Sequence, residues 1–379
     1  MIYKAIGIMS GSALDGLDIV YVHFQETGGQ WSYEIQQADT VPYSPEWAER
    51  LQKAISLSAL DYQLLHTDYG HYIGGAVNLF IDAHGLHHKV DLVASHGHTT
   101  FHVPARRMTG QIGDGAAIAA ETGLPVVSDL RAMDMAFGGQ GAPIVPIGEK
   151  LLLGAYAYFL NLGGIANLSI PSPDRFSAFD VCPANRVLNM LVAPLGKAYD
   201  EDGKTAATGR VHEPLLTELN AQPYYAQPYP KSLANDFGTD VIYPIVKKYQ
   251  LPVEDELRTY VEHIAQQIGR AVAAETLRPF DKLRAGSAQG DSHLTTTAQM
   301  LATGGGGLNL FLMERINVQL KELSVEAVTP DRKLVNYKEA LIMALMGVLR
   351  WREEYNVLAS VTGASRNSIN GAVWMGNEA

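Results

Sequence analysis

The stretch Gly7-Ile-Met-Ser-Gly-Ser-Ala-Leu-Asp-Gly-Leu-Asp18 decides the fold, and it lies close to the N-terminus. Apolar residues lead into it from Ile2–Ile8 and out of it through Ile19–Phe24, which predicts a strand–turn–strand hairpin. Its internal glycines can take positive φ and let backbone amides approach an anion, and its two serines add hydroxyl donors. Asp15 and Asp18 are carboxylates of the kind that hold Mg²⁺. The turn therefore suits a nucleotide polyphosphate, although a plain Gly/Ser/Asp hairpin turn fits the same residues.

The composition describes an ordinary globular protein. A chain of 379 residues fits two domains, and 47% hydrophobic with 18% charged residues excludes a disordered chain. A formal charge of −11 argues against nucleic acid as a partner. The single cysteine, Cys182, and the lack of a leader-like apolar core predict a cytoplasmic protein. The uncharged span 151–170 contains Asn161 and Asn167, so we interpret it as two strands and expect no membrane segment.

Strands alternate with helices in the first part of the chain, which predicts an α/β domain. The expected strands are 33–38, 91–95 and 126–128, and the expected helices are 45–58, 61–86 and 118–122. The strand at 91–95 ends in three histidines, His96, His98 and His102. Their spacing matches no zinc signature, so we expect a polar loop that contacts ligand or serves the structure. The glycine-rich run 137–143 is expected to be an interdomain segment or a ligand loop.

A second glycine hairpin is predicted about 150 residues after the first. Residues 156–162 and 165–170 are expected to be strands joined by Gly163 and Gly164. Such a repeat indicates two related halves, and the cleft between two halves is the natural place for a ligand.

Asp180 is the candidate general base, because an acid where a strand ends can take a proton from water. An Asx-turn aspartate is the alternative. Asn185 is expected to cap the following helix. Further on, Gly304–Asn309 lies between a strand at 300–302 and a helix, where glycines permit close approach of a base or a phosphate. Residues 281–299 are expected to be a surface insertion, and Glu339 to lie in a helix over 335–350.

Ten stretches in the same order resemble the anhydro-N-acetylmuramic acid kinase family across nearly the whole chain. They are Gly7–Asp18, Ser95–Pro104, Gln111–Asp114, Val127–Pro146, Asn161–Asn167, Phe179–Asn189, Tyr199–Gly209, Pro223–Ser232, Gly304–Asn309 and the helix bearing Glu339. The resemblance implies the sugar kinase/actin/Hsp70 fold, with two ribonuclease-H-like α/β domains and ATP in the cleft between them. The first lobe is expected at 1–135, joined by 350–379, and the second at 136–349.

The resemblance also assigns roles to residues. It implies ATP with Mg²⁺, an amino sugar substrate and a homodimer. The expected nucleotide-binding residues are Gly11, Ser12, Ala13, Leu14, Asp15, Gly16, Leu17, Asp18, Gly163, Gly164, Gly304, Gly305, Gly306 and Asn309, with Asp15 and Asp18 as metal ligands. The expected substrate-binding residues are His96, His98, Arg131, Gln140 and Asn185. Asp180 and Glu339 are the expected catalytic carboxylates.

The implied reaction opens the 1,6-anhydro ring of the sugar with water while O6 receives the γ-phosphate of ATP. Asp180 would activate the water, Glu339 would lie near it, and Arg131 would contact the lactyl carboxylate. The sequence departs from the usual family pattern at three places. Ser12-Ala13 stands for Thr-Ser, His98 stands for Gln, and Cys182-Pro-Ala-Asn185 stands for Gly-Pro-Gly-Asn. A kinase for another sugar and a catalytically silent nucleotide sensor remain as alternatives.

Overall fold

The computed structural model describes residues 1–11, 14–172, 176–228, 231–233, 236–276 and 297–376. The chain forms two compact units. Unit 1 comprises Met1–Gly154, Asp174–Phe176 and Tyr337–Ala379, and unit 2 comprises Ala155–Pro173 and Ser177–Asn336. The outer boundaries of unit 2 thus follow residues 154 and 336 rather than the expected 135 and 349. The difference arises because residues 136–154 and the helix bearing Glu339 make their contacts within unit 1.

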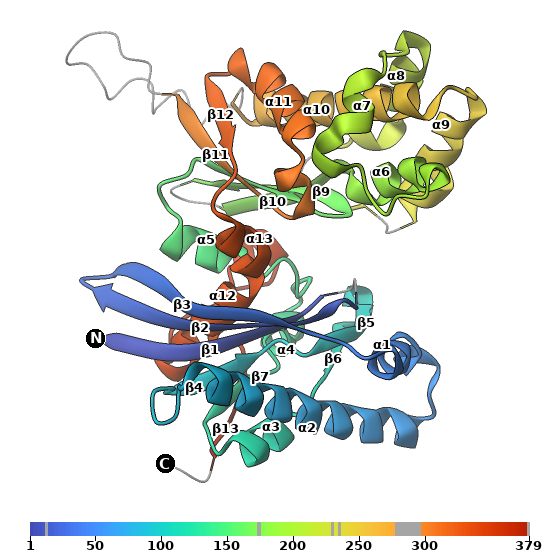
Figure 1. The fold of residues 1–379 in the computed structure, drawn as a ribbon. Coiled ribbons are helices and arrows are strands. Elements are labelled where there is room, and N and C mark those ends of the chain that lie inside the picture. Colours follow the sequence, from blue (N-terminus) through green and yellow to red (C-terminus); the bar gives the residue numbers. More distant parts are fainter. Residues whose placement is uncertain (12–13, 173–175, 229–230, 234–235, 277–296, 377–379) are drawn as a thin grey trace, which may run out of the picture. The chain divides into compact units, whose positions relative to one another are not determined.

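The sheet of unit 1 has the strand order β13-β7-β4-β1-β2-β3 (Figure 1). Its strands are β1 (Ile2–Ser10), β2 (Gly16–Thr27), β3 (Gln30–Pro42), β4 (Leu92–Ser95), β7 (Val126–Ser128) and β13 (Ala372–Trp374). β1 pairs antiparallel with β2, which confirms the first predicted hairpin. β2 pairs antiparallel with β3, while β1, β4 and β7 run parallel to one another.

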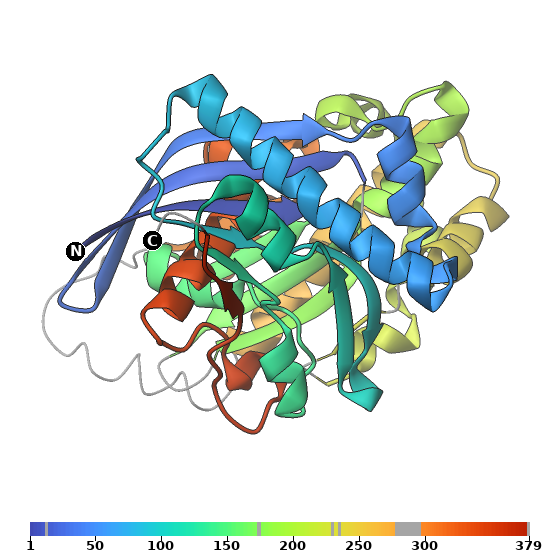
Figure 2. The ribbon, with the colours of Figure 1, turned by 90° about the horizontal axis from the view of Figure 1, so that it is seen from below.

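One face of this sheet is covered by the long helix α2 and by α3 (Figures 1 and 2). The helices of unit 1 are α1 (Pro45–Gln52), α2 (Ala59–His84), α3 (Gly115–Thr122), α4 (Ala132–Ala136), α5 (Pro146–Leu152), α13 (Ala359–Thr362) and α12 (Arg332–Trp351), which enters unit 1 at Tyr337. Ser58 caps the start of α2, and Gly85, at φ 58°, ends it in the left-handed conformation that favours glycine. Apolar side chains of the strands, including Ile6 and Ile8, pack with Tyr69 and Ile73 of α2 in one core.

Helix α12 covers the other face of the sheet. Successive side chains of a strand point to opposite faces, so Gly7 faces away from the core that contains Ile6 and Ile8. A Cβ at Gly7 would lie 2.0 Å from the carbonyl oxygen of Ala340. The backbone of α12 therefore rests directly on β1, a distance that only glycine permits.

A hairpin stands where the sequence predicted a loop after β4. β5 (His98–Val103) pairs antiparallel with β6 (Met108–Ile112), so the histidines at 98 and 102 belong to a strand. The prediction of a loop was wrong because the polar residues of this small, two-stranded sheet hide the apolar alternation that marks a strand.

Unit 2 repeats the strand pattern of unit 1. Its sheet has the order β10-β9-β8-β11-β12, with β8 antiparallel to β9 and parallel to β11, and β11 parallel to β12. The strands are β8 (Tyr158–Leu162), β9 (Ile165–Pro171), β10 (Phe176–Pro183), β11 (Ala298–Thr303) and β12 (Val325–Val328). In unit 1 the strands β3-β2-β1-β4-β7 have the same order in the sheet, and β2, β1, β4 and β7 have the same relative directions as β9, β8, β11 and β12. The two related α/β halves predicted from the glycine hairpins are therefore confirmed.

Helices cover the sheet of unit 2 and form its core. They are α6 (Asn185–Val192), α7 (Lys204–Thr208), α8 (Glu213–Asn220), α9 (Tyr243–Lys248), α10 (Val253–Thr276) and α11 (Leu310–Lys321). Short helical turns lie at Ala54–Ser56, Pro104–Arg106, Ala193–Leu195, Glu201–Gly203, Pro223–Ala226, Phe237–Ile242 and Gly305–Leu308. Apolar residues of α6, α10 and α11 pack against Leu160 and Leu162 of β8.

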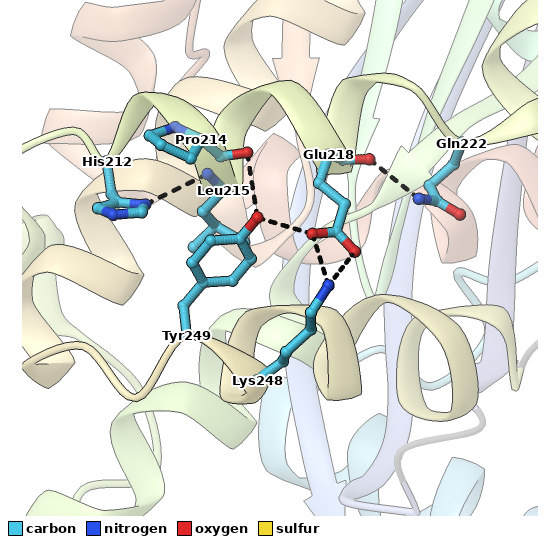
Figure 3. Close-up of polar contacts among 7 residues, drawn as sticks. All are labelled: His212, Pro214, Leu215, Glu218, Gln222, Lys248 and Tyr249. Carbon is cyan, nitrogen blue, oxygen red and sulfur yellow. Dashed lines mark hydrogen bonds and ion pairs between the residues drawn. The ribbon is translucent and has the colours of Figure 1, made fainter.

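Polar side chains join α8 to α9 at the surface of unit 2 (Figure 3). Glu218 accepts hydrogen bonds from Tyr249 Oη at 2.7 Å and from Lys248 Nζ at 3.0 Å. Both donors hold the pKa of the Glu218 carboxyl below its ordinary value. His212 caps α8, since its Nδ1 accepts from the amide of Leu215.

The end of the expected insertion also differs. Ala298 and Gln299 belong to β11, whereas 281–296 lies outside the described residues. The expected strand began too late because only the apolar residues 300–302 of β11 were assigned to it. The C-terminal segment forms β13, which pairs antiparallel with β7. In the described part of the chain, none of the helices has the length and apolar character needed to cross a bilayer. The span 151–170 holds the end of α5, then β8 and most of β9.

We expect Gly7→Ala to lower the free energy of unfolding by about 2 kcal/mol or more, because overpacking forces β1 and α12 apart. Gly75→Ala is the matched control, since Gly75 lies within α2 and a Cβ there would meet nothing within 4 Å. That control should be neutral or stabilising by up to about 1 kcal/mol. Urea denaturation of the three proteins measures the difference. Equal stability of the two variants would contradict the close approach of α12.

Candidate functional site

A cavity of about 410 Å³ opens in unit 1 where the first hairpin turns. It is lined by Met9, Ser10, Gly11, Asp15, Asp18, His96, Thr99, Arg131 and Glu339. These residues come from the end of β1, the start of β2, the ends of β4 and β7, the start of β5 and from α12. The parallel strands β1, β4 and β7 end at this edge of the sheet, which brings together residues far apart in sequence.

Three carboxylates face this cavity: Asp15, Asp18 and Glu339. Thr40 donates its hydroxyl hydrogen to Asp18 at 2.6 Å. Burial raises the pKa of Asp18 to about 6, and the negative charges of Asp15 and Glu339 raise it further, while Thr40 opposes the shift. Oxygen ligands of this kind fit Mg²⁺, and a cation here would relieve the repulsion. Among the described residues, no group of three or more metal-ligating side chains is already gathered around one point.

Arg131 supplies the positive charge of the cavity. Its Nε donates to His96 Nε2 at 2.8 Å, and its Nη1 donates to the carbonyl of Gly141. Within the described part of the chain, Nη2 donates to no protein acceptor. Burial lowers the pKa of the Arg131 guanidinium to about 10, against the opposing effects of Glu339 and Asp134, so it stays charged at neutral pH. A fixed guanidinium with free N–H groups is suited to a carboxylate or a phosphate.

His96 is neutral and orients Arg131. Its Nε2 must accept, because Arg131 Nε can only donate, so its proton is on Nδ1, which bonds the carbonyl of Gly97 at 2.9 Å. Burial and the neighbouring Arg131 lower the pKa of His96 to about 3. The sequence placed His96 at the substrate, and the structure places it on the cavity wall with both ring nitrogens engaged by protein.

His98 lies behind the cavity rather than on its surface. Its Nδ1 is 3.0 Å from Ser10 Oγ, which also bonds the hydroxyl of Tyr43 at 2.7 Å. Tyr43 in turn bonds the buried hydroxyl of Tyr69. Ser10 lines the cavity, so this chain of polar groups fixes the orientation of its hydroxyl.

The glycine turn itself differs from the expectation in its backbone. Leu14, with φ 56°, takes the left-handed conformation, whereas Gly16 does not. Gly16 is required instead because a Cβ there would lie 2.5 Å from the carbonyl oxygen of Val41 in β3. Leu17 is fully buried in the core, so its side chain is not available to a ligand. Ser12 and Ala13 lie outside the described residues.

Asp180 of unit 2 lies in β10, three residues before the end of the strand. Asn167 Nδ2 donates to Oδ1, while Ser232 Oγ and the amide of Leu233 donate to Oδ2 at 3.2 and 2.7 Å. Burial raises the pKa of the Asp180 carboxyl, and these three donors oppose the shift. The side chain is only half-buried. The result is a carboxylate that is oriented, partly accessible and more basic than an ordinary aspartate.

The second glycine hairpin is attached to the start of α6. The amides of Ala184 and Asn185 donate to the carbonyls of Gly164 and Gly163 at 2.8 and 3.1 Å. Asn185 was expected to cap α6, but it is the first residue of the helix, and its side chain donates to the carbonyl of Leu162 at 2.8 Å. The preceding residue, Ala184, has no capping side chain, so the position of the cap was misplaced by one residue.

The third glycine run packs against the same hairpin. A Cβ at Gly304, where φ is 79°, would lie 2.7 Å from Asn161 Oδ1, and one at Gly306 would lie 2.7 Å from Leu162 Cβ. A Cβ at Gly305 would meet only Asn185 Nδ2, at 3.6 Å. Asn309 caps α11 by accepting from the amide of Leu312. The structure thus brings Gly163, Gly164, Asn185 and Gly304–Gly306 together within unit 2.

Two residues of the unit 1 cavity were not expected from the sequence, Met9 and Thr99. Thr99 lies in β5, and it was missed because the sequence predicted a loop in place of this strand. Gln140 was expected at the substrate, but it does not line the cavity; its amide donates to the carbonyl of Thr362 at 2.8 Å. The expected partners Gly11, Asp15, Asp18, His96, Arg131 and Glu339 all line one cavity.

The raised pKa of Asp18 predicts a pH-dependent stability. The unfolded aspartate ionises near pH 4 and the folded one near pH 6, so stability is lost as the pH rises through this interval. Asp18→Asn should therefore be more stable than the parent by about 1 kcal/mol at pH 7.5, allowing for partial exposure, with the gain vanishing near pH 4. Urea denaturation at both pH values measures this. The exposed Glu326→Gln on β12 is the control, and a similar pH-dependent gain in it would contradict the assignment.

Similarity to known proteins extends over nearly the whole chain. A family model described as "Anhydro-N-acetylmuramic acid kinase" matches residues 3–376. The anhydro-N-acetylmuramic acid kinase of Photobacterium profundum is 32% identical, with 98% of this chain and 99% of that protein aligned. That of Francisella tularensis subsp. novicida is 33% identical, with 98% of each aligned. A solved activator of 2-hydroxyisocaproyl-CoA dehydratase from Clostridium difficile, with bound ADPNP, aligns with 92% of this chain and 96% of that chain at 12% identity and a TM-score of 0.39.

Proposed function

Because the chain belongs to the anhydro-N-acetylmuramic acid kinase family, we propose that it phosphorylates 1,6-anhydro-N-acetylmuramic acid with ATP and opens the ring with water. The oxygen of water bonds to C1, and the bond from C1 to the bridging oxygen breaks. That oxygen, O6, takes the γ-phosphoryl group, and a proton of the water passes to a protein base. The products are N-acetylmuramic acid 6-phosphate and ADP, a step in recycling cell-wall amino sugars in the cytoplasm.

The observation that carries this proposal is the environment of Asp180. A general base needs an ionised carboxylate with a fixed direction and a pKa above the ordinary aspartate value. Three donors fix both oxygens of Asp180, and burial raises its pKa. The side chain is partly exposed, which leaves room for water beside it. Asp180 is our candidate for the base that deprotonates the attacking water.

Arg131 and Glu339 are proposed to bind the sugar. The free Nη2 of Arg131 suits the lactyl carboxylate, which distinguishes this sugar from other amino sugars. Glu339 lines the same cavity and is the proposed second carboxylate near the water.

ATP is proposed to bind at the three glycine-rich turns, Gly11–Asp18, Gly163–Gly164 and Gly304–Gly306. Asp15 and Asp18 would hold Mg²⁺, directly or through water, and the bound ion would neutralise phosphate charge. Phosphoryl transfer itself then depends on positioning, because the chain has little covalent chemistry to perform in such a step. The homodimer implied by the family resemblance is also part of the proposal.

Asp180→Asn should lower kcat by about 10³-fold, because the amide cannot accept the proton. ATP affinity should stay within about twofold, since the substitution leaves the glycine-rich turns unchanged. Release of ADP in a coupled assay with the anhydro sugar, and calorimetric titration with an ATP analogue, measure the two quantities. In the parent, activity should fall as the pH drops through the raised pKa of Asp180, since only the ionised form is a base.

Ser232→Ala is the matched control, because it removes one donor and leaves the carboxylate. It should keep most of the activity. Retained turnover in Asp180→Asn would remove Asp180 from the role of base. Phosphorylation of an ordinary sugar without turnover of the anhydro sugar would favour a kinase of another specificity. ATP binding without sugar-dependent ADP release would favour a nucleotide sensor.

Arg131→Met should abolish the preference for the lactyl group. We expect the parent to use 1,6-anhydro-N-acetylmuramic acid at least about 100-fold better, as kcat/KM, than 1,6-anhydro-N-acetylglucosamine, which lacks that group. In Arg131→Met the two sugars should differ by less than about fivefold, because the charged partner is gone. Met keeps the apolar contacts of the side-chain stem. An unchanged preference would place the carboxylate elsewhere.

A further inference from the structure

A buried polar cluster in unit 1 connects the C-terminal segment to the loop that follows α4. Asp134, on α4, is completely buried. Its Oδ1 accepts the hydroxyl hydrogen of Thr362 at 2.7 Å, and its Oδ2 accepts the amide hydrogen of Gly141 at 2.8 Å. Thr362, on α13, is 228 residues away in sequence and is itself buried. A buried carboxylate needs such donors, so each of them contributes to its position.

The backbone of the loop is held by the same C-terminal segment. The amide of Gln140 donates to the carbonyl of Thr362 at 2.8 Å, and that of Ser365 donates to the carbonyl of Phe137 at 3.1 Å. The loop also lies close against Asp134, because a Cβ at Gly139 would be 2.2 Å from Oδ2 of that carboxylate. Thr362 therefore contacts the loop both directly and through Asp134.

The backbone of Asp134 is connected to α12 through two buried asparagines. Its amide donates to Asn370 Oδ1 at 3.0 Å, and the amide of Asn370 donates to Asn356 Oδ1 at 2.7 Å. Asn356 Nδ2 donates to the carbonyl of Met346 in α12 at 3.1 Å. All these polar groups are buried. The backbone of Asp134 is thereby fixed, so a change at Thr362 acts mainly on the carboxylate and the loop.

This loop ends at the carbonyl that binds Arg131. Gly141 donates its amide hydrogen to Asp134 and accepts from Arg131 Nη1 through its carbonyl oxygen. With φ 65°, Gly141 has a backbone conformation that favours glycine and that directs these two groups to different partners. His96 holds the other side of the guanidinium at Nε. The direction of the free Nη2 is set by these two contacts.

We propose that Thr362 is a positioning residue for Arg131, acting through the carboxylate of Asp134 and the backbone of Gly141. The C-terminal segment thus determines how firmly the cavity holds an anionic group of the substrate. This inference rests on the proposed function for the identity of that group, the lactyl carboxylate of the anhydro sugar.

The test replaces the Thr362 hydroxyl by a methyl group of the same shape. Thr362→Val should raise KM for 1,6-anhydro-N-acetylmuramic acid about tenfold, leaving kcat and KM for ATP within about twofold, because only the hold on Arg131 is loosened. Thr362→Ser keeps the hydroxyl and should behave as the parent. Steady-state kinetics of the three proteins, with both substrates varied, give these values.

A double-mutant cycle separates positioning from a general structural effect. In an Arg131→Met background, Thr362→Val should change kcat/KM for the anhydro sugar by less than about twofold. An equal loss in both backgrounds would show that Thr362 acts on the fold as a whole and would overturn the proposal. An unchanged KM in Thr362→Val alone would overturn it as well.

The proposal is also testable if the protein does not use this sugar. The Nε–H signal of Arg131 in ¹⁵N NMR spectra, assigned by its loss in Arg131→Met, reports the hydrogen bond to His96. It should shift in Thr362→Val and stay in place in Thr362→Ser. No turnover of the anhydro sugar with this shift present would refute the proposed function alone. An Nε–H signal that does not move would refute the positioning role.

Discussion

The direct contact between α12 and β1 at Gly7 is the constraint on which the arrangement of unit 1 depends. Only a residue without Cβ lets the carbonyl of Ala340 approach the strand so closely. The contact continues where Gly347 meets Ala94 of β4 and where Gly148 of α5 meets Ile342. A helix held at three glycines has one register along the sheet. That register puts Glu339, one residue before Ala340, on the cavity wall beside the hairpin turn.

The cavity contains charged groups whose burial and proximity lower the stability of the folded protein. Three carboxylates share it with one half-buried guanidinium, and the raised pKa of Asp18 reports the cost of their burial and proximity. His96 would add to the charge if protonated, but burial and its hydrogen bond from Arg131 keep it neutral. Among the described residues that line the cavity, the positive charge is therefore located on Arg131 alone, and its guanidinium has a fixed direction. The three carboxylates leave an excess of negative charge, which a bound cation would reduce. Such an arrangement is typical of binding sites, where stability is reduced in favour of a ligand.

The sequence was sufficient for the parts of the fold that depend on local patterns. Both glycine hairpins have apolar residues on either side of a turn, so the hairpins and the two related halves could be predicted from neighbouring residues. The hairpin β5–β6 and strand β13 could not, because their residues are largely polar or few and their pairing is decided by distant partners. Gly16 shows the same limit. Glycine is required at this position because Val41 lies opposite it in the sheet, and this contact cannot be predicted from neighbouring residues.

The candidate site residues also divide into those that can be recognised from the local sequence and those whose role depends on distant partners. The glycine turn supplied Asp15 and Asp18, and the family resemblance supplied Arg131, but neither gave a sign that Thr362 contacts Asp134 from the far end of the chain. Side chains that face the cavity are recognisable by their chemistry, whereas those that hold them are ordinary polar residues whose role exists only in the fold. Asp180 illustrates what the second group contributes. Without the amide of Leu233 and the side chains of Asn167 and Ser232, burial alone would raise its pKa further and leave its direction undefined. A useful base at neutral pH requires both the burial and the donors, so the contacts around the carboxylate are as much part of the site as the carboxylate itself.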